Sequence, residues 1–171
     1  RGPALVFDRN EDYIEVSDDP DLDVTPDTVL IVRNAGPKGY PGFPEVGNMP
    51  LPKKLLEAGI TDMVRVSDAR MSGTGFGTCV LHVAPEAAAG GPLGIVETGD
   101  IVVLDAANRK LDIDVPDEEI ARRMKKFTPQ EAVATRGWEQ LYIQHVTGAD
   151  TGADLDFLHG SSGSVPGRHS H

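Results

Sequence analysis

The sequence predicts an α+β fold, in which several short strands are accompanied by a few helices. The chain holds a series of short apolar runs, and turn residues separate them, with 19 Gly and 13 Pro among 171 residues. Short apolar runs bounded by glycine and proline are typical of strands. Two other segments carry the capping residues and charge order that are typical of helices. The pattern therefore predicts a sheet, open or closed, with flanking helices.

The first half of the chain predicts most of the sheet. Residues 28–33 are almost continuously apolar, which predicts a strand buried on both faces. Residues 8–27 are acidic and rich in turn residues, so we expect a surface loop with one helical turn. Pro52 suits the first position of a helix and Gly59 its C-terminal cap. The expected elements are strands at residues 4–7, 28–33, 61–66 and 79–83 and a helix at residues 52–58.

The second half predicts a hairpin and three helices. Residues 101–105 and 110–114 are joined by a turn-like segment and form the expected hairpin, and residues 93–96 are a further strand candidate. Acidic residues open residues 116–126 and basic residues close them, which complements a helix dipole. Residues 85–89 predict a short helix with Glu86 in its first turn. Residues 138–146 predict a helix whose stripe packs in the core, formed by Trp138, Leu141, Tyr142, His145 and Val146.

The composition excludes several classes of function. The net charge of −11 argues against a nucleic-acid partner, which needs a basic face. No apolar run approaches the ~20 residues of a membrane span. The one cysteine, Cys79, allows no disulfide within the chain and suits a reducing, cytoplasmic compartment. Cys79 and His82 lie in an apolar run, so we expect both in the core. Because the chain opens without methionine or a signal peptide, we expect a piece of a longer protein.

The glycine-rich stretch at residues 67–78 is the clearest candidate for a binding loop. Three glycines stand within five residues, and only Gly73 separates Ser72 from Thr74. Glycine lets a backbone approach a ligand and leaves N–H groups free to point at it, so both hydroxyls could face one small polar ligand. The alternative is an ordinary hairpin whose hydroxyls bond their own backbone.

A second loop, at residues 36–50, is rich in glycine and proline. Folded domains rarely carry two such loops without a use for them. Glu45 is either an ordinary surface acid or a preorganised carboxylate ligand for a hard cation such as Mg²⁺. Lys38 either holds an anionic substrate or is solvated. The residues alone leave these alternatives open.

Residues 67–78, followed by residues 81–93, resemble the C-terminal domain of the dihydroxy-acid and sugar-acid dehydratase family. The resemblance extends over nearly the whole chain. Residues 69–74, Ala-Arg-Met-Ser-Gly-Thr, are most similar to the aldonate branch that includes the L-arabinonate and D-xylonate dehydratases. The branched-chain amino-acid branch tends to have Gly-Arg-Phe-Ser-Gly-Gly there. Gly75 departs from the sugar-acid branch, which more often has alanine.

The resemblance implies a β-barrel-like swivelling β/β/α domain with flanking helices over residues 1–171, carried beside a larger N-terminal iron–sulfur domain. It also implies a C-terminal tail, residues 159–171, that reaches toward the active site. The implied reaction dehydrates a sugar acid to a 2-keto-3-deoxy sugar acid, with Mg²⁺ and an iron–sulfur cluster, expected to be [2Fe-2S]. One cysteine cannot hold such a cluster, so its ligands are expected in the N-terminal domain.

The resemblance also implies roles for individual residues. Ser72 matches the serine whose alkoxide removes the C2 proton, a role that requires nearby positive charge and hydrogen-bond donors. Thr74 and Gly73 match the substrate-binding positions, His171 matches a C-terminal histidine that reaches the site, and Glu45 matches a ligand of Mg²⁺. The chain would then hold part of a site, so we expect it to be inactive alone.

Two rival functions remain open from the sequence. One is the branched-chain dihydroxy-acid dehydratase of the same family, and the other is a sugar-acid-binding domain without catalysis. The expected partners are a small sugar acid, the N-terminal domain of the same protein and further copies of it in a dimer or tetramer. Neither nucleic acid nor membrane is expected.

Overall fold

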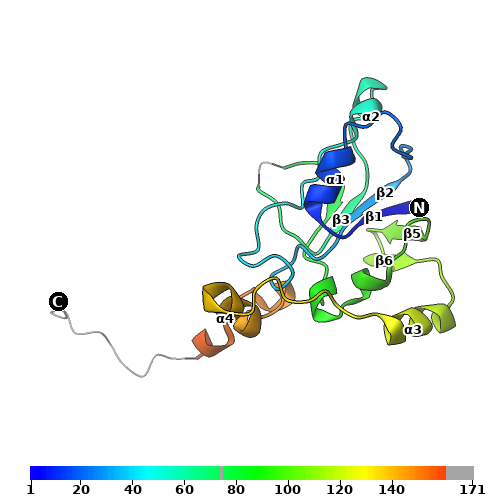
Figure 1. Cartoon of the computed structure of the whole chain (residues 1–171). Helices are drawn as coiled ribbons and strands as arrows, with labels where there is room; N and C mark the ends of the chain where they lie inside the picture. The colour runs from blue at the N-terminus through cyan, green and yellow to red at the C-terminus, as the bar shows by residue number, and fades with distance from the viewer. Residues whose placement is uncertain (74, 161–171) are drawn as a thin grey trace, which may run out of the picture.

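A computed structural model describes residues 1–73 and 75–160. In this part of the chain, six strands form one mixed, curled sheet in the order β4-β3-β2-β1-β5-β6 (Figure 1). The first four strands in that order pair in parallel, and β5 pairs antiparallel with both β1 and β6. This arrangement confirms the predicted α+β class. The strands are β1 Gly2–Phe7, β2 Val29–Val32, β3 Arg65–Ser67, β4 Cys79–Val80, β5 Ile101–Asp105 and β6 Lys110–Ile113.

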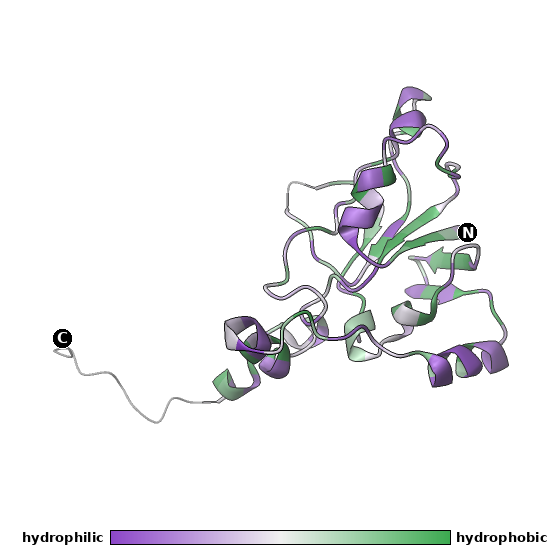
Figure 2. Ribbon diagram, viewed as in Figure 1, coloured by the Kyte–Doolittle hydropathy of each residue, from purple (hydrophilic) through white to green (hydrophobic). Residues whose placement is uncertain are grey.

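Four α-helices and four short 3₁₀ helices accompany the sheet in the described residues. Figure 2 shows hydrophobic residues along the strands and hydrophilic residues along much of α1 and α3. The outer helical faces are therefore solvated, and the core lies at the sheet. The helices are α1 Asn10–Val16, α2 Lys53–Glu57, α3 Asp117–Lys126, α4 Gly137–His145, η1 Ala87–Ala89, η2 Pro92–Ile95, η3 Ala149–Thr151 and η4 Asp156–Leu158.

β2 is buried on both faces, as its apolar run predicts. Leu30 and Val32 point into one cluster of buried residues, which includes Tyr13 of α1 and Leu55 of α2. The alternate residues of β2 point into a second cluster on the opposite face, together with residues of η2 and β5. Alternation of side chains across a strand explains why one continuous apolar run serves both clusters.

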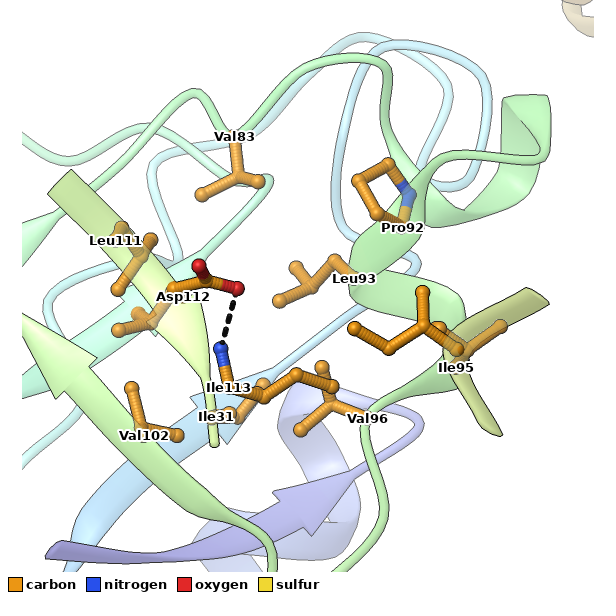
Figure 3. A pocket seen from close by; sticks show the side chains of 12 residues that line it. Ile31, Val83, Pro92, Leu93, Ile95, Val96, Val102, Leu111, Asp112 and Ile113 are labelled. Atoms are coloured by element: carbon orange, nitrogen blue, oxygen red, sulfur yellow. Dashed lines mark hydrogen bonds between the residues drawn. The ribbon is translucent and has the colours of Figure 1, made fainter. Parts of the chain in front are cut away.

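An apolar cavity of about 170 Å³ lies within the second cluster, between the sheet, η2 and α3 (Figure 3). Ile31 and Leu111 line it from strands, Leu93 from η2 and Ile120 from α3. Asp112 is the one charged residue in the lining, and its carboxylate accepts the backbone N–H of Ile113. The cavity contains none of the residues that the sequence singles out for chemistry.

Several predicted elements differ from the structure. Residues 8–27 contain the seven-residue helix α1 rather than a single helical turn. The strand predicted at residues 93–96 is the 3₁₀ helix η2, which Pro92 opens, because a short apolar run does not distinguish a strand from a buried helical turn. The strand predicted at residues 61–66 begins only at Arg65. The helix predicted at residues 85–89 is the 3₁₀ helix η1.

The core stripe predicted for residues 138–146 is wrong. α4 forms as expected, but none of its residues is buried, and Trp138 is 85% exposed. Only Val146, directly after the helix, is buried. Helical spacing predicts an apolar face but not what covers it.

No helix in residues 1–73 and 75–160 is both long and apolar enough to cross a membrane.

Candidate active site

The candidate site lies where two loops leave neighbouring strands. β2 and β3 are parallel, and their register ends with Val32 opposite Ser67. The residues that follow these strands therefore begin side by side at the carboxyl edge of the sheet, where ligands bind in many open α/β sheets. We call residues 34–50 the proline loop and residues 68–78 the glycine loop.

Arg70 of the glycine loop holds the two loops together. Its carbonyl accepts the N–H of Gly47 at 2.7 Å, and its Nε donates to the carbonyl of Phe43. Its guanidinium carbon lies 5.6 Å from the centre of the buried Phe43 ring. A Cβ on Gly47 would lie 2.9 Å from the carbonyl oxygen of Arg70, so the close approach of the loops requires glycine there. Main-chain and side-chain contacts thus fix the proline loop against the glycine loop.

Glu45 stands at the surface of the proline loop, beside the glycine loop. Its side chain is 48% exposed, and its Oε1 lies 3.7 Å from Nη1 of Arg70. Among the described residues, no group of three or more His, Cys, Asp or Glu could hold a metal ion. One accessible carboxylate fits a single oxygen ligand of Mg²⁺, which is bound through few carboxylates and keeps several waters. The other ligands would have to come from outside the described residues.

Ser72 lies two residues beyond Arg70, so the structure brings it and Glu45 onto adjacent loops. Ser72 is half-buried, and its carbonyl accepts the N–H of Gly75 at 3.0 Å. Gly73, directly after Ser72, is exposed, and its backbone is therefore accessible to a ligand. Thr74 and His171 lie outside the described residues. Of the predicted tail at residues 159–171, the structure describes only residues 159 and 160.

The sequence reasoning did not predict the burial or the partners of two carboxylates, Asp68 at the start of the glycine loop and Glu86 beyond its end. Asp68 is 0% exposed and accepts three backbone N–H groups at 2.9 to 3.1 Å. Glu86 is 4% exposed and accepts the N–H groups of Lys38 and Gly39 at 2.9 to 3.0 Å. Burial raises the pKa of both carboxyls against the opposing effect of these hydrogen bonds. Glu86 therefore serves the proline loop and stands at the N-cap of η1, not in a first helical turn.

His82 and Cys79, both expected in the core, are less buried than predicted. His82 is exposed, and its ring centre lies 5.6 Å from that of Phe43. Cys79 is half-buried, and burial raises the pKa of its thiol. A raised pKa leaves less of the reactive thiolate at neutral pH. Cys79 is therefore poorly suited to act as a nucleophile.

The family model and the relatives that match this chain all indicate the same family. Residues 1–153 match the family described as dihydroxy-acid/6-phosphogluconate dehydratase, C-terminal. The whole chain is 53% identical to an L-arabinonate dehydratase of Rhizobium leguminosarum bv. trifolii, of which it covers 30%. Over 92% of its length it is 59% identical to a 6-deoxy-6-sulfo-D-gluconate dehydratase of Pseudomonas putida, covering 27% of it.

Identity is lower to the dihydroxy-acid dehydratases. Over 91% of its length the chain is 38% identical to a dihydroxy-acid dehydratase of Aquifex aeolicus, covering 28% of that protein. In each case the match spans less than a third of the relative. The chain therefore belongs to the dihydroxy-acid/6-phosphogluconate dehydratase family, is more similar to the two sugar-acid dehydratases named above than to this dihydroxy-acid dehydratase, and corresponds to the family's C-terminal domain.

Proposed function

We propose that this chain is the C-terminal part of a hydro-lyase that dehydrates a sugar acid, an aldonate, to a 2-keto-3-deoxy sugar acid. The observation that carries the proposal is the placement of Ser72 and Glu45 on two adjacent loops that Arg70 holds together. Identities of 53% and 59% to sugar-acid dehydratases, against 38% to a dihydroxy-acid dehydratase, favour the sugar-acid substrate.

In the proposed reaction, Ser72 as its alkoxide takes the proton from C2, the C3–O bond breaks with loss of hydroxide, and the proton that Ser72 accepted joins the hydroxide to give water. The resulting enol tautomerises to the 2-keto acid. Gly73 and Thr74 would bind the substrate carboxylate beside Ser72, with His171 as a further contact. Glu45 would hold Mg²⁺, which, with an iron–sulfur cluster, supplies electrophilic charge for the developing enediolate and the leaving hydroxyl.

The proposal divides the site between this chain and a preceding domain. The chain spans about 30% of the length of the curated relatives. We propose that an N-terminal domain supplies the cluster, of the [2Fe-2S] type, and the remaining ligands of Mg²⁺, so that this chain alone has no activity. The full-length enzyme would be a dimer or tetramer. It would be cytoplasmic, because thiolate ligation of a cluster requires reduced cysteines.

Substitution of Ser72 by alanine in the full-length enzyme tests the proposal. We expect formation of 2-keto acid from an aldonate to fall by about 10³-fold or more, because the only proposed base is lost. The absorbance of the cluster should stay unchanged. Ser17→Ala is the matched control, since the Ser17 hydroxyl donates to the carbonyl of Ile14 in α1, away from the site. Activity within tenfold of wild type would refute the role of Ser72.

The same assay separates the two rival functions. Pentonates, hexonates and dihydroxyisovalerate should be offered to wild-type enzyme at equal concentration. Turnover of dihydroxyisovalerate above that of every aldonate would favour the branched-chain enzyme. Aldonate binding without any 2-keto acid would favour a domain that binds sugar acids without catalysis.

A further inference from the structure

The two buried carboxylates behind the loops differ from ordinary buried acids in what they bind. In the part of the chain that the structure describes, every hydrogen bond recorded for the Asp68 and Glu86 side chains comes from a main-chain N–H. Buried carboxylates are costly unless their oxygens are hydrogen-bonded. Five amides from two separate segments are used for this purpose, those of Asn34, Ala35, Lys38, Gly39 and Ala87.

The two carboxylates act on one stretch of backbone. Asp68 binds the start of the proline loop at Asn34 and Ala35, and Glu86 binds it again at Lys38 and Gly39. Asp68 also accepts the N–H of Ala87, the residue after Glu86, at 2.9 Å. The first six residues of the proline loop are therefore held at both ends by acids that are connected to each other.

Close packing leaves the backbone little freedom at this point. A Cβ on Gly36 would lie 2.6 Å from Oε2 of Glu86, and one on Gly39 would lie 2.5 Å from the carbonyl oxygen of Asn34. The carbonyl of Gly39 accepts Nε2 of Gln130 at 3.0 Å, so a third segment holds the same turn. A side chain at either glycine would therefore force the backbone away from its present place beside the carboxylates.

Both held segments lead directly to the candidate catalytic groups. Glu45 follows Gly39 by six residues in the proline loop, and Ser72 follows Asp68 by four residues in the glycine loop. The position of a metal ligand or base depends on such supporting groups, and small displacements reduce rates or affinities strongly.

We infer that Asp68 and Glu86 are positioning residues, a carboxylate clamp that sets where Glu45 stands relative to Ser72. The inference rests on the proposed function, because it assigns the clamp to the site of that reaction. A side-chain amide cannot replace either acid, since its NH₂ group would face main-chain N–H groups, and donors repel donors. The loss of a clamp bond should therefore move the proline loop without removing any group from the site.

The test uses Glu86→Gln in the full-length enzyme, with the exposed Glu57→Gln of α2 as the matched control. Hydrogen–deuterium exchange should show faster uptake in peptides that cover residues 34–45 in Glu86→Gln alone. Calorimetric titration with Mg²⁺ should show about tenfold weaker binding, while the absorbance of the cluster is unchanged. A merely structural role would lower the melting temperature without changing Mg²⁺ affinity, and that result would overturn the inference.

A parallel Glu45→Gln variant separates failure of the inference from failure of the proposed function. If Glu45→Gln weakens Mg²⁺ binding and Glu86→Gln does not, the clamp is refuted and the proposed metal ligand stands. If Glu45→Gln leaves Mg²⁺ binding unchanged, the proposed role of Glu45 is refuted, and the assignment of the clamp to it fails with it.

A second substitution covers the case in which Glu86→Gln does not fold. Gly36→Ala keeps both acids but places a methyl group against the Glu86 carboxylate. It should produce the same faster exchange and weaker Mg²⁺ binding. Gly59→Ala is its control, since a Cβ there meets no atom within 4 Å, although its positive φ makes the substitution strained. Unchanged exchange and affinity in Gly36→Ala would again refute the clamp.

Discussion

Two regions of the molecule bury carboxylates in opposite ways. Behind the loops, Asp68 and Glu86 bind main-chain amides. Beside β5, Asp100 binds the guanidinium of Arg123 from α3 through two hydrogen bonds of 2.5 and 3.1 Å, with both side chains no more than 12% exposed. The ion pair joins two elements at one point, whereas the amide bonds hold a run of backbone in one shape.

The pKa directions follow from this difference. Burial raises the pKa of Asp68 and of Glu86, because amide dipoles do not offset the loss of water around a charge. Burial alone would also raise the pKa of Asp100, but hydrogen bonds from Arg123 and from the N–H of Glu97 outweigh it and lower that pKa. The loop region therefore contains acids whose burial is costly and is compensated only in part by amide hydrogen bonds. In the helix region, the buried charge of Asp100 is compensated by the guanidinium of Arg123.

The largest expected effect is that of Asp68→Asn on the loop region. The amide would leave at least one of three buried N–H groups without an acceptor and would place a donor against another, so we expect the unfolding free energy to fall by about 3 kcal/mol. Denaturant unfolding of the 171-residue chain measures it, and the exposed Asp12→Asn is the control. A loss equal to that of the control would show that the amide bonds contribute nothing.

The next effect is that of Arg123→Ala on the helix region. It leaves Asp100 without its cation in a mostly buried place, so we expect the unfolding free energy to fall by about 2 kcal/mol. Arg122→Ala is the matched control, since Arg122 is exposed and its pairing with Glu119 lies at the surface of α3. In the full-length enzyme, dehydration should be unchanged by either substitution. Reduced turnover in Arg123→Ala alone would mean that the two regions are coupled.

The sequence predicts elements better than it predicts partners. The continuous apolar run of β2 indicates burial on both faces, and the structure confirms it, because strand alternation is a local property. Trp138 has the spacing of a packed helix face, yet it is exposed, because spacing cannot specify a neighbour. The hairpin of β5 and β6 was predictable from its apolar runs and its turn.

The candidate site shows the same limit. Glycine and proline content identified both loops, because those residues act through their own backbone. The contact between Arg70 and Glu45 was not predictable, since it depends on how the two loops pack. The partners of Asp68 lie 19 to 34 residues away in the sequence, and those of Glu86 lie 47 and 48 residues away. An acid after a strand and an acid before three alanines carry no local signal of such bonds.

The smallest expected effect is a difference in how acid changes stability, and its sign separates the two regions. The raised pKa of Glu86 lets the folded chain hold this proton to higher pH than the unfolded chain, whose glutamates titrate at about 4.3. Stability that depends on Glu86 therefore falls as pH rises through its raised pKa. Asp100 has a lowered pKa, so its contribution to stability is complete above the unfolded value of about 3.9 and is lost as pH falls through the lowered pKa.

Unfolding of the wild-type chain, Glu86→Gln and Arg123→Ala across about pH 3 to 7 measures both signs. The advantage of wild type over Glu86→Gln should shrink as pH rises, because the substituted amide carries no charge to bury. Its advantage over Arg123→Ala should grow as pH rises, because only ionised Asp100 gains from the guanidinium. If both differences changed with the same sign, burial or pairing alone would govern both regions, and the contrast between an amide-held and a cation-held carboxylate would be lost.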